Sequence, residues 1–225
     1  MIRYPAFGIS IPTQYAIHGI DVSKYQQRID WQDVKSMRVS DIQIQFSFIK
    51  ATEGLDDVDR QFRRNWAEAA AAGVHRGAYH YFYPHRSPKI QAEHFLETVP
   101  LDAGDLPPVL DVEETFGLTK PVLQQRVAEW LKQVQDRLQI KPILYTNADF
   151  YEKYLAGRFD SFPLWVAHYQ VRDQPRVKRN WQFWQHSETG RVNGIDAPVD
   201  FNAFSGDSAA FQQLLLRKIP AAVSQ

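Results

Sequence analysis

Two carboxylates stand two residues apart at the end of a short apolar run, in the segment Pro108-Val-Leu-Asp-Val-Glu-Glu114. Side chains at positions i and i+2 of a β-strand project from the same face, about 6.5–7 Å apart along the chain. Like charges held this close cannot both ionise freely, so one of the two pKa values rises. A protonated carboxyl beside an ionised one is what the hydrolysis of a glycosidic bond requires. The same pair could instead cap a helix or bind a local arginine, and spacing alone does not decide between these interpretations.

The composition narrows the classes of function. The chain has 225 residues, a length that suits one domain with a sizeable core. Its 26 basic and 26 acidic side chains balance, which argues against charge-driven binding of nucleic acid or of a membrane surface. The chain has no cysteine, which excludes disulfides, thiolate metal sites and a cysteine nucleophile. No apolar run approaches the roughly 18 residues of a membrane span.

The histidines do not form a metal-binding pattern. His75, His80 and His85 recur at intervals of five, which suits neither a helical i, i+4 pair of ligands nor a strand pair. His80 alternates with Tyr79 on a predicted strand, so we expect it to be packed or hydrogen-bonded. No metal and no cofactor are therefore expected.

The elements that must position Asp111 and Glu113 alternate between strands and helices. Helix caps, early prolines and apolar spacing mark their limits. Strands are predicted at residues 17–22, 46–51, 77–82, 109–112 and 142–145, and the helices that follow them at 30–37, 59–72, 87–96, 119–138 and 147–155. Strands at 164–168, 183–185 and 199–201 and a helix at 208–216 complete the series. This order predicts an α/β fold, an eight-stranded (β/α) barrel of five βα units plus three strands.

Polar side chains gather where the predicted strands end, which is where barrels of this kind carry their active sites. Any one of them could be a helix cap or a core hydrogen-bonding group, but together they favour a site. The side chains that join Asp111 and Glu113 in this way are Asp21, Glu53, Tyr79, Tyr145, Gln185, Asp200 and Asn202.

Seven short motifs occur along the chain in order. They are Asp21-Val-Ser-Lys-Tyr-Gln26, Phe48-Ile-Lys-Ala-Thr-Glu-Gly54, Gly77-Ala-Tyr-His-Tyr-Phe82, Pro108-Val-Leu-Asp-Val-Glu113, Leu144-Tyr-Thr-Asn147, Leu164-Trp-Val-Ala-His-Tyr169 and Val199-Asp-Phe-Asn-Ala-Phe204. Each is weak alone, but the series resembles the glycoside hydrolase family 25 lysozymes, which are N-acetylmuramidases. The resemblance implies the same barrel and hydrolysis of the β-1,4 bond between N-acetylmuramic acid and N-acetylglucosamine in peptidoglycan. A single catalytic barrel domain is then expected over residues 17–225, after an N-terminal extension over residues 1–16.

The resemblance also implies roles for single residues. Glu113 matches the general acid, and Asp111 matches its partner, which acts on the far side of the sugar or orients the substrate's own 2-acetamido group. Asp21 and Asp200 match two flanking acids. Glu53, Tyr79, Tyr145 and Gln185 match positions that line the sugar cleft, and Trp165 and Trp184 either offer flat faces to sugar rings or pack in the core. Glu114 is expected on the opposite strand face from Glu113, in a structural role.

Peptidoglycan is then the expected partner, with no nucleic acid, no membrane and a monomeric chain. A secreted or periplasmic, cell-wall-facing location is expected, although no signal peptide is visible in the first residues. Two alternatives remain, a chitinase-like glycosidase acting on N-acetylglucosamine polymers and a non-catalytic glycan-binding barrel. The close spacing of Asp111 and Glu113 favours retention of configuration, whereas a water held by Asp21 or Asp200 would give inversion.

Overall fold

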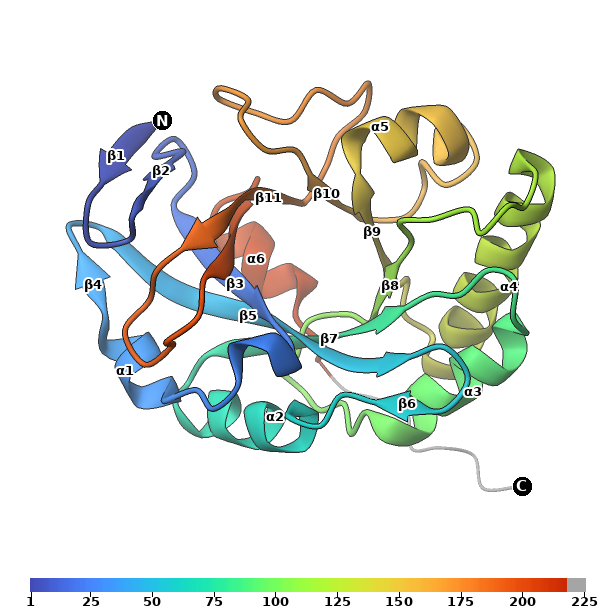
Figure 1. The fold of residues 1–225 in the computed structure, drawn as a ribbon, viewed down its shortest axis with the longest axis horizontal. Helices are drawn as coiled ribbons and strands as arrows, with labels where there is room; N and C mark the ends of the chain where they lie inside the picture. The colour runs from blue at the N-terminus through green and yellow to red at the C-terminus, as the bar shows by residue number, and fades with distance from the viewer. Residues whose placement is uncertain (218–225) are drawn as a thin grey trace.

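Eight strands close into a barrel at the centre of the computed structural model, which describes residues 1–217 (Figure 1). The strands are β3 (Ile17–Val22), β5 (Ile42–Glu53), β7 (His75–Tyr81), β8 (Val109–Asp111), β9 (Ile143–Asn147), β10 (Leu164–Ala167), β11 (Phe183–Gly190) and β12 (Val199–Phe204). Each is paired with the next in this order, and the pairing of β12 with β3 closes the ring. All neighbours run parallel except β12, which is antiparallel to both β11 and β3.

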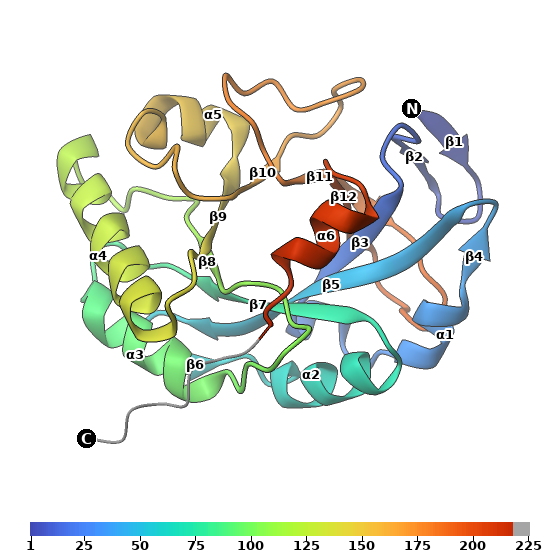
Figure 2. The same ribbon diagram turned by 180° about the vertical axis from the view of Figure 1, so that it is seen from behind.

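Helical segments follow each of the first five strands and cover the outside of the barrel (Figures 1 and 2). They are α1 (Trp31–Ser36), α2 (Phe62–Ala71), α3 (Pro88–Thr98), α4 (Lys120–Leu138), and α5 (Ala148–Phe150) continued by the π-helical turn η2 (Tyr151–Leu155). The last three strands have no such helix between them. The predicted barrel of five βα units plus three strands is therefore confirmed.

Local sequence sets where these helices begin. The carboxylate of Asp30 accepts the backbone N–H groups of Gln32 and Asp33 at the start of α1. Asn147 caps α5 in the same way. Thr119 precedes α4 without a side-chain hydrogen bond, so this helix depends on its buried stripe instead. That stripe comprises Leu123, Val127, Trp130, Leu131, Val134 and Leu138.

One further helix, α6 (Ser208–Leu214), lies across the end of the barrel at which β7 begins, since its Phe211 packs against His75 (Figure 2). Its Phe211 packs against Phe46 and Phe204, with ring centroids 5.7 and 5.3 Å apart. Above them Phe48 stacks on Trp165 at 4.2 Å. A Cβ on Gly77 would lie 2.7 Å from the Phe48 ring, so glycine is required there for this aromatic floor. The barrel interior is thus filled by packed side chains.

Two regions are more ordered than the sequence indicates. β5 extends beyond the predicted 46–51, because its first half alternates buried and partly exposed residues and pairs with β4 (Arg38–Val39). In the predicted extension, β1 (Ile2–Tyr4) and β2 (Ile9–Ile11) form an antiparallel hairpin that packs against β11. The remaining short elements are η1 (Lys24–Gln26) and β6 (Asp57–Val58). Residues 218–225 of the predicted domain lie outside the described residues.

Candidate active site

A cleft of about 520 Å³ opens at the mouth of the barrel. Its lining combines carboxylates with tyrosines: Asp21, Val22, Ser23, Tyr25, Gln26, Lys50, Glu53, Tyr79, Tyr81, Tyr83, Asp111, Glu113, Glu114, Phe116 and Asp200. The structure therefore brings together Asp21, Glu53, Tyr79, Asp111, Glu113 and Asp200 of the predicted site. Asp200 reaches the mouth from the beginning of its strand, because β12 is antiparallel to its neighbours.

Asp21 and Asp200 form one pair of neighbouring acids. They are direct register partners on β3 and β12, so their side chains emerge on the same face. Burial raises the pKa of Asp21 to about 6, although it accepts hydrogen bonds from Asn202 and Gln185. Burial and the adjacent charge of Asp21 raise the pKa of Asp200 to about 9. At neutral pH the pair thus carries one proton, on Asp200, and one charge, on Asp21.

Two buried amides orient the carboxylate of Asp21. The Nδ2 group of Asn202 and the Nε2 group of Gln185 donate to Asp21 Oδ2 at 2.7 and 2.8 Å. The amide oxygens are themselves occupied, that of Asn202 by the indole N–H of Trp165 at 2.7 Å. That of Gln185 accepts from the hydroxyls of Tyr145 and Tyr169 at 2.8 and 2.6 Å. Because the oxygens are taken, both amides must turn their N–H groups toward Asp21.

Asp111 and Glu113 form the second pair of neighbouring acids in the cleft. Burial and the charge of Glu113 raise the pKa of Asp111 well above its usual range. Burial also raises the pKa of Glu113, partly offset by a hydrogen bond from Asp111, and the charge of Glu114 raises it further. The pair therefore holds a proton to a higher pH than an isolated carboxyl would. Glu113 is the more accessible of the two, and Asp111 Oδ1 is buried without a hydrogen-bond partner among residues 1–217.

Glu114 does not lie on the opposite strand face from Glu113, where the sequence predicts it. Strand β8 ends at Asp111, so the alternation of faces that would turn Glu114 away from the cleft does not continue to residue 114. Glu114 is exposed and lines the same cleft as Glu113. The expectation that it points to the opposite face is wrong, because the chain has already left the strand.

Glu53 at the end of β5 stays charged in the cleft wall. Burial alone would raise its pKa, but hydrogen bonds from Lys50 and Tyr83 and the charges of Lys50 and Lys24 outweigh it and lower the pKa. The Lys50 Nζ to Glu53 Oε2 distance is 2.5 Å. Lys50 and Tyr83 were not expected from the sequence. Their only signal was that each lies close to a predicted strand end.

The two tryptophans predicted to contact sugars are core residues. Trp165 is 1% exposed and lies beneath the mouth, on Phe48. Trp184 is fully buried and its indole N–H donates to the backbone carbonyl of His168 at 2.9 Å. Since Phe183 and Gln185 face the barrel interior, Trp184 between them must face outward. The aromatic side chains exposed at the cleft are Tyr25 and Phe116 instead.

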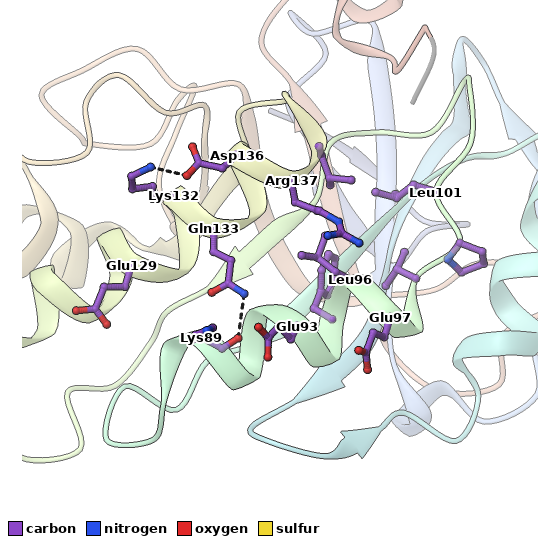
Figure 3. Close-up of a pocket in the computed structure, with 14 residues that line it drawn as sticks. Lys89, Glu93, Leu96, Glu97, Leu101, Glu129, Lys132, Gln133, Asp136 and Arg137 are labelled. Atoms are coloured by element: carbon purple, nitrogen blue, oxygen red, sulfur yellow. Dashed lines mark hydrogen bonds and ion pairs between the residues drawn. The ribbon is translucent and has the colours of Figure 1, made fainter. Parts of the chain in front are cut away.

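A larger hollow of about 1050 Å³ lies between α3 and α4, outside the barrel (Figure 3). It contains the Lys132–Asp136 ion pair and a hydrogen bond from Gln133 to the backbone carbonyl of Lys89. Its other acidic side chains are spread along the two helices and do not converge as the carboxylates of the mouth do. The candidate active site is therefore the smaller cleft.

Residues 1–217 contain no group of three or more His, Asp or Glu side chains placed to hold a metal ion. His80, as expected, is buried and hydrogen-bonded, to Thr52 at 2.7 Å and to Gln91 at 3.1 Å. Within the same part of the chain, no helix has the length and apolar character needed to span a membrane.

A (β/α) barrel whose mouth holds two pairs of carboxyl groups in a cleft lined by tyrosines has the residue types that glycoside hydrolysis uses. The chain belongs to the glycosyl hydrolases family 25, whose family model matches residues 20–195, and it is therefore a glycoside hydrolase. The resemblance found in the sequence is confirmed.

Three relatives illustrate the similarity. The Escherichia coli protein YegX (strain CFT073) is 53% identical over 89% of this chain and 74% of its own length. Lysozyme M1 of Streptomyces globisporus is 35% identical over 86% of this chain and 69% of its own. The solved structure of a bacterial lysozyme from Streptomyces coelicolor superimposes with a TM-score of 0.80 at 33% identity, covering 88% of this chain and 96% of that one.

Proposed function

We propose that this family 25 glycoside hydrolase is a muramidase that hydrolyses the β-1,4 bond between N-acetylmuramic acid and N-acetylglucosamine in bacterial peptidoglycan. The family and the lysozymes among its relatives support this class of substrate. The observation that carries the mechanism is the proton-holding pair of Asp111 and Glu113 in an open cleft. Nothing among the relatives favours the chitinase alternative.

Glu113 acts as the general acid. It is the member of its pair that is not fully buried, so its carboxyl is the one that can reach a glycosidic oxygen. A hydrogen bond to a carboxylate favours its charged form. When the substrate's 2-acetamido N–H binds Asp111, Asp111 therefore ionises, and the proton of the pair is placed on Glu113.

Asp111 positions the nucleophile. Asp111 is mostly buried but lines the floor of the cleft beside Glu113, where its carboxylate can accept the acetamido N–H of a sugar that enters the cleft. The acetamido oxygen then attacks the anomeric carbon while the glycosidic C–O bond breaks and the leaving oxygen takes the proton of Glu113. Water opens the resulting cyclic intermediate and returns a proton to Glu113, so that configuration is retained overall.

Asp21 and Asp200 stabilise the positive charge that develops on the sugar ring. Asp21 is the charged member of its pair at neutral pH and is fixed by two amides. A preoriented charge needs no reorganisation as the transition state forms. Asp200, protonated below about pH 9, donates to Asp21 and keeps it in place. Glu53 and Tyr79 line the cleft, while Tyr145 and Gln185 act from beneath it through Asp21.

The substrate determines where the protein acts. Peptidoglycan lies outside the cytoplasmic membrane, so we place the activity in the periplasm or on the cell-wall side. The site is complete within one chain, which fits a monomer, and the barrel over residues 17–217 with its N-terminal hairpin acts as one catalytic unit. Both proposals are checked on the protein as expressed, by cell fractionation and by light scattering.

Product analysis tests the proposed reaction. Purified peptidoglycan is digested, the new reducing ends are reduced with borohydride, and the fragments are identified by mass spectrometry. A muramidase leaves N-acetylmuramic acid at the reducing end, and only that product agrees with the proposal. Reduced N-acetylglucosamine ends, or faster cleavage of chitin oligomers than of peptidoglycan, would establish a different bond specificity. Binding without cleavage would leave the glycan-binding alternative.

A further inference from the structure

Phe116 occupies a backbone conformation that suits other residues better. The turn at residues 115–118 is closed by a hydrogen bond from the Leu118 N–H to the Thr115 carbonyl at 2.9 Å. Both central residues have positive φ, 49° at Phe116 and 79° at Gly117. This is the pattern of a type I′ turn, for which asparagine followed by glycine is the favoured sequence. A bulky aromatic in the left-handed region is uncommon, so something other than the turn accounts for Phe116.

Burial does not account for it either. The Phe116 side chain is 38% exposed and lines the cleft of the acid pairs. One side of its ring rests on Tyr83 and His85, with centroids at 5.2 and 4.7 Å. Folding therefore fixes the ring in place but leaves part of its surface open to the cleft.

The residues that support the Phe116 ring are themselves held in place by specific contacts. The Tyr83 hydroxyl donates to the carboxylate of Glu53, which is also paired with Lys50. Gly54 has φ +59°, and a Cβ there would lie 2.8 Å from the Tyr83 ring, so the end of β5 is shaped to admit this ring. The loops after β5, β7 and β8 thus converge to hold one exposed aromatic surface at the rim. Because the ring is already held in place, less conformational entropy is lost when a ligand binds to it.

We propose that Phe116 is a stacking platform for a sugar ring of the glycan strand, next to the two rings whose bond is broken. The inference rests on the proposed muramidase function. A pyranose ring presents an apolar C–H face that fits an aromatic ring and hydroxyls that fit a neighbouring acceptor. The exposed carboxylate of Glu114, two residues from Phe116 in the same cleft, is such an acceptor.

The decisive variant is Phe116→Asn, because asparagine is favoured at this turn position and removes the ring without disturbing the fold. With peptide-free glycan strands as substrate, we expect KM to rise roughly 2- to 15-fold, the range for loss of one aromatic contact, with kcat nearly unchanged. The melting temperature is expected to stay equal or rise, since the turn is relaxed. Phe116→Trp is expected to restore KM. Val122→Ala is the matched control, since Val122 is also 38% exposed but lies on α4 outside the cleft.

Several outcomes would overturn the platform. One is an unchanged KM in a folded Phe116→Asn protein. Another is a loss that appears with intact peptidoglycan but not with peptide-free strands, which would assign the ring to the peptide stem. Should Phe116→Asn misfold, Phe116→Gly makes the same test. The affinity for glycan strands is also measured in Glu113→Gln and in the double variant Glu113→Gln/Phe116→Asn. Since neither protein is expected to turn over substrate, this comparison separates binding from turnover. If the wild-type protein failed to cleave peptidoglycan at all, the proposed function itself would fall.

Discussion

Glu114 lies in the same cleft as Glu113, although the two are consecutive in the chain. Their proximity has an electrostatic consequence, because the negative charge of Glu114 is one of the causes that raise the pKa of Glu113. An exposed carboxylate beside the proposed general acid therefore helps to keep that acid protonated. The effect is screened by salt, since Glu114 is exposed to solvent.

Glu114→Gln is expected to move the basic limb of the pH–rate profile to lower pH. The basic limb reports loss of the proton from the Asp111–Glu113 pair, and removing a neighbouring negative charge lowers the pKa of Glu113. The measurement is kcat/KM against pH on solubilised peptidoglycan at low salt. Glu93→Gln, an exposed acid on α3, is the control. If both variants keep the wild-type limb, Glu114 does not influence the acid.

Glu113→Gln keeps the size of the side chain and removes the proton donor. We expect turnover to fall by a factor on the order of 10² to 10⁴, with the fold retained. Circular dichroism and thermal unfolding establish that the variant is folded, and a turbidity assay measures clearing of peptidoglycan. Clearing at near the wild-type rate would show that another group donates the proton.

Much of the barrel could be predicted because its signals are local. The cap at Asp30, the apolar stripe of α4 and the alternation of strands and helices each depend on residues near one another in sequence. The structure does bring Asp111 and Glu113 together in one cleft, although β8 ends at Asp111, so the alternation of strand faces is not what places Glu113 there. Strand ends that meet at one barrel mouth then gathered Asp21, Glu53 and the rest of the acids.

The features that could not be predicted depend on where strands stop and which way they run. The direction of β12 was not visible, so Asp200 was assigned to a strand end and not to a strand beginning. The end of β8 at Asp111 was not visible, so Glu114 was turned away from the cleft. Trp184 does not face the cleft, because side chains alternate between the two faces of a strand. Phe183 and Gln185 face the barrel interior, so Trp184 faces outward, and the sequence alone does not show which set of residues points inward.

Asp200→Asn is expected to stabilise the protein at neutral and alkaline pH. The pKa of Asp200 is raised to about 9 in the fold, above the roughly 3.9 of an unfolded aspartate. The folded state therefore holds a proton that the unfolded state releases, and stability is lost as pH rises from about 4 to about 9. Asparagine does not titrate, so its advantage grows over this interval. The melting temperatures of variant and wild type at pH 5 and pH 8 measure this advantage. Each kcal/mol of added stability is expected to raise the melting temperature by about 2–4 °C.

A stability gain at position 200 is expected to cost activity, as is common where function needs a strained site. An advantage of Asp200→Asn that is equal at pH 5 and pH 8 would show that titration of Asp200 is not its source. Asp207→Asn, which alters the cap of α6 far from the mouth, controls for the general effect of removing an acid.

His18 and His186 are expected to make the protein sensitive to acid. Burial lowers the pKa of His18 to about 4, partly offset by the backbone carbonyl of Tyr15. Burial and the charge of His18 lower the pKa of His186 to about 3. Both values lie below the roughly 6.5 of an unfolded histidine, so the unfolded state binds protons more readily. Stability contributed by the neutral rings is then lost as pH falls from about 6.5 towards 4.

His186→Phe tests this behaviour. The ring lies between Trp184 and Phe201, at 5.5 and 6.3 Å, and its nitrogens have no hydrogen-bond partner among residues 1–217. Phenylalanine fits such apolar surroundings. We expect the free energy of unfolding at pH 7, measured with denaturant, to change by less than about 1.5 kcal/mol. The loss of this free energy between pH 6.5 and pH 4 is expected to be smaller in the variant than in the wild-type protein. Wild-type and variant curves that stay parallel across this interval would contradict the assignment.

The close contact of Asp111 and Glu113 predicts the stereochemical outcome. An inverting glycosidase holds its two carboxyl groups about 6.5–9.5 Å apart so that a water fits between the base and the sugar. Here Asp111 and Glu113 are two residues apart in the chain, line the same cleft, and are close enough for each to affect the pKa of the other. In the proposed mechanism the 2-acetamido group, held by Asp111, supplies the nucleophile without a water on the far face.

Proton NMR of the freshly released reducing end distinguishes the two routes. Retention gives the β-anomer first from the β-linked strand, followed by slow mutarotation. An initial α-anomer would require a water activated across the cleft, and Asp21 is the group placed to do it, since it is ionised at neutral pH and lies on a different strand from Glu113. Asp21→Asn separates these roles further. A residue that only stabilises charge can be replaced with partial loss of rate, whereas loss of a general base would remove turnover that added azide could restore as an external nucleophile.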